Sequence, residues 1–79
     1  MPKIRIEGYE FFFYSNEGNE DPHVHVYIDG SEIKFWLAQG ELATQNPRVS
    51  QHKINRVAKV IRHHSNTLQG FWDDYQSRR

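Results

Sequence analysis

The 79-residue sequence contains no cysteine and no long apolar run. Without cysteine, a disulfide framework and any thiolate metal site are excluded, and the composition fits a reducing compartment. No segment approaches the roughly 18 apolar residues that a membrane span needs. The start, Met1-Pro2-Lys3-Ile4, lacks the apolar stretch of a signal peptide. These absences predict a cytoplasmic protein with no membrane partner.

The short motifs that carry common enzyme chemistry are absent as well. There is no glycine-rich strand-to-helix loop to bind phosphate, and no serine stands in a recognisable nucleophile elbow. An enzyme is not excluded by this, but the sequence favours a non-enzymatic function.

Aromatic residues are plentiful in a chain that is one domain at most, residues 1–79. A domain this short buries only roughly 60% of the surface that its unfolded chain exposes. Five Phe, four Tyr and two Trp, 14% of the chain, can anchor such a small core. They also exceed what the core can easily enclose, so we expect some on the surface, covered by a protein partner or a second copy of the chain.

The net charge of zero hides an asymmetry between the two parts of the chain. Residues 1–46 hold three basic and eight acidic side chains, a balance of −5, whereas residues 47–79 hold seven basic and two acidic, a balance of +5. Either an acidic sheet layer and a basic helical layer attract each other, or a basic helix face contacts nucleic acid or an acidic partner.

Alternating apolar residues predict an α+β fold that begins with an antiparallel sheet of three to five strands. Lys3–Ile6 alternates, Gly8 interrupts the pattern, and the aromatic run Tyr9–Tyr14 suits a strand partly covered on both faces. Glu41–Thr44 is a weaker candidate for a further strand.

The sequence Asp29-Gly30 separates two strictly alternating runs, which is typical of a two-residue hairpin turn. This turn fixes a register in which Val24, Val26, Ile28, Ile33 and Phe35 face the core. On the opposite face the register places His25 across from Lys34, His23 across from Trp36, and Tyr27 across from Glu32. We expect the two histidines there to be half-exposed, so that replacing both with alanine leaves the fold intact.

Helical periodicity begins after Ser50, a typical N-cap residue. An apolar stripe continues through the end of the chain, as Ile54, Val57, Ala58, Ile61, His64, Leu68, Phe71, Trp72 and Tyr75. One long helix would satisfy this stripe, but the cap-like Ser65-Asn66-Thr67, with Gln69 completing a capping box, favours two consecutive helices at about 51–64 and 67–77. The outward positions of the first helix form a basic rim: Lys53, Arg56, Lys59 and Arg62.

Two strand motifs carry a family resemblance. Pro22-His23-Val24-His25-Val26 and Lys34-Phe35-Trp36-Leu37, preceded by Phe11-Phe12-Phe13-Tyr14, resemble a family of short bacterial proteins known as domain-of-unknown-function family 4160. The resemblance extends over nearly the whole chain, with Trp72 and Tyr75 matching a family feature of the helical end. It implies the same fold, a bacterial origin, and a gene arrangement similar to toxin–antitoxin or other two-gene modules.

His23 and His25 are the candidate metal ligands, because residues two apart on a strand project on the same side. Zinc would need further ligands, for which Asp21 is the nearest candidate and Glu20 and Glu32 are others. Lys34, across from His25, adds positive charge where a dication would bind. We therefore expect no cofactor and interpret His23, His25, Tyr27, Lys34 and Trp36 as a surface that recognises a partner.

The sequence thus favours a small bacterial, non-enzymatic binding or regulatory module that acts with a protein partner. The first alternative is a metal-dependent hydrolase or nuclease that uses His23 and His25. The second is a nucleic-acid binder that uses the basic rim, with weak binding expected.

Overall fold

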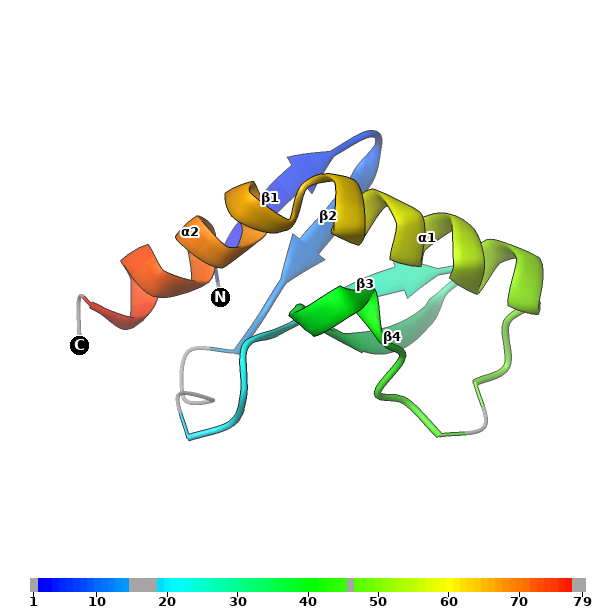
Figure 1. Cartoon of the computed structure of the whole chain (residues 1–79). Coiled ribbons are helices and arrows are strands. Elements are labelled where there is room, and N and C mark those ends of the chain that lie inside the picture. The colour runs from blue at the N-terminus through cyan, green and yellow to red at the C-terminus, as the bar shows by residue number, and fades with distance from the viewer. Residues whose placement is uncertain (1, 15–18, 46, 78–79) are drawn as a thin grey trace.

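The computed structural model describes residues 2–14, 19–45 and 47–77 (Figure 1). Strands β1 (Lys3–Ile6), β2 (Tyr9–Phe12), β3 (His23–Ile28) and β4 (Ser31–Trp36) form one antiparallel sheet in the order β1-β2-β3-β4. A 3₁₀ turn, η1 (Ala38–Gly40), leads to the helices α1 (Gln51–His63) and α2 (Ser65–Gln76). The predicted α+β fold, with its antiparallel sheet and two consecutive helices, is confirmed.

The hairpin between β3 and β4 has the predicted turn. Asp29 and Gly30 have φ angles of 52° and 80°, the positive values that a type I′ turn requires at both positions. The register is also as predicted, from Ile28 opposite Ser31 to His23 opposite Trp36. A second two-residue turn joins β1 and β2, where Glu7 and Gly8 have φ angles of 50° and 84°.

The core lies between one face of the sheet and the two helices, which run across that face (Figure 1). Strand residues that alternate along the chain meet the apolar stripe of α1 and α2. The buried side chains on the two sides of this contact are Phe11, Phe13, Val24, Val26, Ile33 and Phe35 from the sheet side, and Ile54, Val57, Ile61, Leu68 and Trp72 from the helices. The predicted face assignment of the hairpin is therefore correct.

The helices begin and end close to the expected positions. The Ser50 hydroxyl accepts a hydrogen bond from the Lys53 backbone N–H at 3.3 Å, which confirms the N-cap. The predicted capping box at Asn66 is wrong, because the His64 carbonyl already accepts from the Leu68 N–H and α2 begins at Ser65. No helix in the described ranges is long and apolar enough to cross a membrane.

The segment after η1 pairs with β4 without forming a regular strand, so the expected strand Glu41–Thr44 is reduced to one bridge, between Phe35 and Leu42. Trp36 N–H donates to the Glu41 carbonyl at 2.7 Å, and Ala43 N–H donates to the Lys34 carbonyl at 2.8 Å. The Thr44 hydroxyl accepts from the Lys34 N–H, so a side chain takes the place of the next backbone acceptor.

Gly40 allows the backbone of η1 to pack closely against α1. Its φ is +63°, and a Cβ atom added there would lie 2.9 Å from the carbonyl oxygen of Ala58. The backbone of Ala58 is part of a helix and cannot move aside cheaply.

We expect Gly40→Ala to destabilise the protein by about 2 kcal/mol, from the positive φ and the clash together. Gly70→Ala is the matched control, since Gly70 lies within α2 with open space around the added Cβ. That control should stabilise the protein by up to about 1 kcal/mol. Urea unfolding of both variants measures the difference, and similar free energies of unfolding would contradict the close packing of η1.

Candidate functional site: the outer face of the sheet

The sheet has a second face, which points away from α1 and α2 (Figure 1). We call it the outer face. The register places on it Lys3, Arg5, Glu10, Phe12, His23, His25, Tyr27, Glu32, Lys34 and Trp36. The five residues that the sequence indicated as a recognition surface, His23, His25, Tyr27, Lys34 and Trp36, are therefore on one face.

Both histidines are buried, and the expectation that they would be half-exposed is wrong. His23 is 0% exposed and His25 is 6% exposed. The Nδ1–H of His23 donates to the backbone carbonyl of Asp21 at 2.9 Å, which orients the ring. A carbonyl only accepts, so this contact places a proton on Nδ1 of His23.

Aromatic rings from distant parts of the chain bury the histidines. Trp72 of α2 reaches the start of β3 and lies 5.0 Å from the His23 ring, measured between centroids, while Trp36 lies at 5.9 Å. His25 stacks on Phe12 at 5.5 Å and meets the edge of Tyr14 at 5.0 Å. Phe12 is itself only 2% exposed. The outer face thus carries a thin second aromatic layer.

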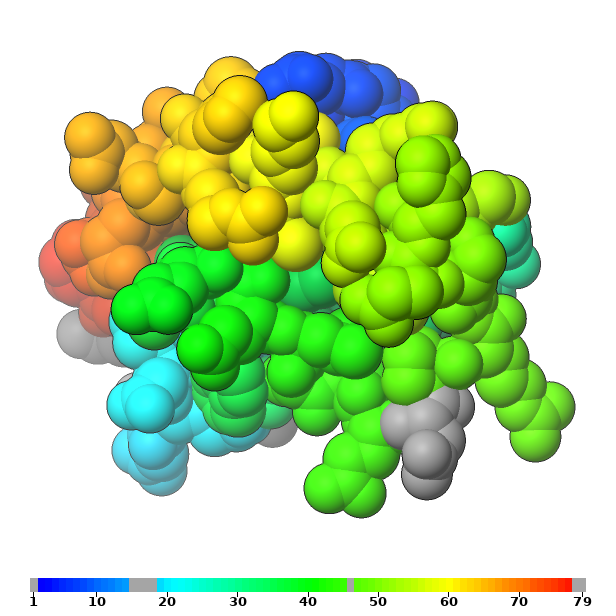
Figure 2. Space-filling model, turned by 45° about the vertical axis from the view of Figure 1, so that its right-hand side comes forward, coloured from blue at the N-terminus to red at the C-terminus, as the bar shows by residue number. Residues whose placement is uncertain are grey.

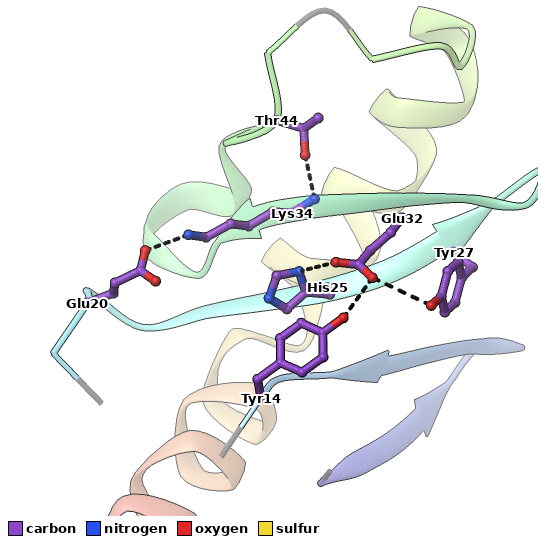
Figure 3. Close-up of polar contacts among 7 residues, drawn as sticks. All are labelled: Tyr14, Glu20, His25, Tyr27, Glu32, Lys34 and Thr44. Carbon is purple, nitrogen blue, oxygen red and sulfur yellow. Dashed lines mark hydrogen bonds and ion pairs between the residues drawn. The ribbon is translucent and has the colours of Figure 1, made fainter. Parts of the chain in front are cut away.

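Glu32 is the polar centre of this layer (Figure 3). One of its carboxylate oxygens accepts from the Tyr14 hydroxyl at 2.8 Å and lies 3.5 Å from the Tyr27 hydroxyl. The other oxygen lies 3.3 Å from Nδ1 of His25. Tyr14 from the end of the β2 segment, and His25 and Tyr27 from β3, therefore converge on one carboxylate.

Lys34 turns away from this centre, although it stands directly across from His25 in the register. Its ammonium group pairs with Glu20 at 2.5 Å (Figure 3). The same group lies 4.5 Å from the centroid of the Trp36 ring. The ion pair and the cation–π contact hold the Lys34 side chain beside Glu20, in the segment before β3, and beside Trp36.

The histidine pair supplies too few ligands for a metal site by itself. The two rings meet edge to face, with centroids 5.3 Å apart. Within the ranges that the structure describes, no group of three or more His, Asp or Glu side chains could hold a metal ion. Asp21 contacts His23 through its backbone carbonyl. Zinc sites use three or four protein ligands, which is more than the two histidines supply.

The four residues of the basic rim of α1 are exposed, but they have different neighbours. Lys53 pairs with Asp29 at 2.6 Å, which is one of the contacts expected if the two layers attract each other. Arg62 packs its stem beside Gly40. Arg56 and Lys59 share a small hollow of about 240 Å³ with His63 and Glu7. Of the four rim residues, Arg56 and Lys59 are the two that line this hollow.

The sequence did not identify Phe12 or Tyr14 as residues of the site. It also did not show that Glu32 is the polar centre of the site. The hairpin register does place Glu32 across from Tyr27, which is a signal for that contact. Tyr14 and Phe12 reach the site through the pairing of β2 with β3, in which Phe12 stands opposite His25. A polar loop separates these strands, so no turn signal fixes their register.

Comparison with known proteins gives one finding. The sequence model of the family described as "Domain of unknown function (DUF4160)" matches residues 8–73. The chain belongs to this family. The match includes β2, β3, β4, α1 and the α2 residues through Asp73, and therefore nearly all of the outer face of this DUF4160 protein. No curated protein and no solved structure gives a match.

We expect His23→Ala to destabilise the DUF4160 fold by about 2–4 kcal/mol, because it removes a fully buried ring packed on two tryptophans. Tyr27→Ala, at a position 57% exposed, should cost about 1 kcal/mol or less. Urea unfolding gives both values. If the His23 variant were as stable as the Tyr27 variant, the packing of Trp72 on β3 would be wrong.

Proposed function

We propose that this DUF4160 protein is a small non-enzymatic binding module that acts with a protein partner through the outer face of its sheet. One observation carries the proposal. Among the described residues, the large apolar side chains that remain exposed are Tyr14 and Tyr27, and both contact Glu32 on this face. Tyrosine is enriched at protein interfaces and at their energetic centres.

The two tyrosines are held in place before any partner arrives. Phe12 packs against both rings, at 5.8 Å from Tyr14 and 5.4 Å from Tyr27 between centroids. Their hydroxyls meet at the Glu32 carboxylate. Side chains that are already ordered lose little conformational entropy on binding, which favours recognition by a preformed surface.

The charges of the outer face favour a protein over a nucleic acid at this surface. Lys3 and Arg5 both contact Glu10, at 3.9 and 3.7 Å, and Lys34 contacts Glu20. Each cation of the face is thus paired with a carboxylate, and Glu32 adds further negative charge. Such a surface has no excess of positive charge with which to attract phosphates.

The family resemblance suggests the biological context of this interaction. We propose a bacterial, cytoplasmic protein whose partner is encoded by a neighbouring gene, in an arrangement similar to a toxin–antitoxin pair. Self-association through the same tyrosines is the competing outcome, and sedimentation of the protein alone distinguishes the two.

The double variant Tyr14→Ala with Tyr27→Ala should weaken binding of the neighbouring gene product at least about tenfold, since interface tyrosines often contribute about 2 kcal/mol or more. Titration calorimetry with the co-expressed partner measures this. Tyr27→Phe keeps the ring and should bind nearly as well as the unaltered protein.

Arg56→Ala with Lys59→Ala is the control for a general surface effect and should leave partner binding unchanged. Full binding by the folded tyrosine variant would refute the proposal. Stoichiometric zinc in the purified protein, lost with His25→Ala, would instead favour the metal-dependent hydrolase or nuclease.

A specific observation also supports a second, weaker function in nucleic-acid binding by α1. No acidic residue occurs in the sequence between Glu41 and Asp73, and Arg56 and Lys59 both line the hollow that also contains His63 and Glu7. Cations that neutralise phosphates release counterions, so binding falls as salt rises.

With two clustered cations, we expect a slope of about −2 in a plot of log affinity against log salt, and a Kd no tighter than about 10⁻⁵ M at physiological salt. Arg56→Ala with Lys59→Ala should abolish the binding of a fluorescent DNA duplex. Lys3→Ala with Arg5→Ala removes two cations elsewhere and should have little effect. Tight binding to one DNA sequence would overturn the proposed partner-binding module and indicate a regulator.

A further inference from the structure

A hollow of about 550 Å³ lies beside the outer face, where three separate segments converge. It is bounded by the residues before β3, by η1 with its neighbours, and by the first turns of α2. Figure 2 shows these cyan, green and orange segments coming together on one side of the molecule. The volume falls within the range of roughly 300–1,000 Å³ that is usual for small-molecule sites, and greatly exceeds that of a single ion.

Backbone contacts hold the walls of this hollow. Leu37 N–H donates to the Pro22 carbonyl at 3.0 Å, which joins the segment before β3 to the end of β4. Trp36 N–H donates to the Glu41 carbonyl, and Gly40 seats η1 against α1. The hollow is therefore formed by the fold itself and does not depend on the arrangement of a single side chain.

The lining is acidic and contains no basic residue. Its charged residues are Asp21 and Glu41. Five other acidic residues described between positions 2 and 45 each contact a basic or histidine side chain: Glu7, Glu10, Glu20, Asp29 and Glu32. The two carboxylates of this stretch that make no such contact within the described residues are the two in the hollow.

The other lining groups are an aromatic ring and side-chain amides. Trp36 is half-buried, and its ring already accepts the ammonium group of Lys34. Gln69 donates its amide N–H to Asp73 at 3.0 Å, which leaves its carbonyl oxygen as an acceptor. Gln39 and Asn66 add further amide groups.

We infer that this hollow is a binding site for a guanidinium group. A guanidinium is planar, always charged and rich in N–H donors, so it can stack on an indole while it donates to carboxylates and amide oxygens. A primary ammonium has the charge but no planar face to stack. The two sources of this chemistry are a free guanidino compound and an arginine side chain of a polypeptide.

The test is a titration of the ¹⁵N-labelled protein, followed through the indole N–H of Trp36 and the side-chain amide of Gln69. The probes are free L-arginine, N-acetyl-arginine amide and N-acetyl-lysine amide. Both arginine probes should shift these signals, and the lysine probe should bind several-fold more weakly. If N-acetyl-arginine amide binds more tightly than L-arginine, the guanidinium group belongs to an arginine side chain of a polypeptide. If L-arginine binds more tightly, the ligand is a free guanidino compound.

The double variant Asp21→Asn with Glu41→Gln should weaken arginine binding roughly tenfold, since each exposed charge pair contributes up to a factor of about five. Glu10→Gln removes an acid on the sheet outside the hollow and should not change the affinity. The same spectra report whether each variant is folded. Absent shifts, equal binding of lysine, or an unchanged affinity in the folded double variant would each overturn the inference.

Discussion

The two-residue turn at Asp29-Gly30 fixes the register on which the rest of the structure depends. Because side chains alternate along a strand, a shift of one residue would exchange the two faces of β3 and β4. Val24, Val26 and Phe35 would then leave the helices, and His25, Glu32 and Lys34 would enter the core. Both turn residues have the positive φ angles that this tight turn requires, so the register is encoded locally in the sequence. The core and the outer face are therefore consequences of the same turn.

Local signals predicted the features that depend on neighbours in the sequence. Asp29-Gly30 defined the hairpin, Ser50 defined the start of α1, and the spacing of Ile54, Val57 and Ile61 identified its buried side. The burial of the histidines could not be predicted in this way. For His23 it depends on Trp72, which is separated from it by 48 intervening residues and reaches it only after α2 has packed. For His25 it depends on Phe12 and Tyr14, which lie across the β2–β3 pairing.

The two proposed sites are neighbours that share structural elements. Trp36 belongs to the outer face through its pairing with His23, and it also lines the acidic hollow. His23 contacts both Trp36 and Trp72, and Trp72 in turn packs on Phe13 at 4.8 Å between centroids. A continuous series of rings thus joins the outer face to α2. A change in the position of α2 would alter the contact between Trp72 and His23 first, and through His23 it would reach Trp36, where the two sites meet.

The order of the elements along the chain has a consequence for biosynthesis. Every strand is paired with the strand next to it in sequence, and both helices follow the complete sheet. Neighbouring hairpins can form as the chain emerges, since their contacts are local. Their apolar face, however, has no cover until α1 and α2 have been synthesised, and exposed apolar strands are prone to aggregate. A nascent chain that stalls before residue 47 would therefore carry Tyr14, Tyr27 and Glu32 but would lack the helices that complete its fold.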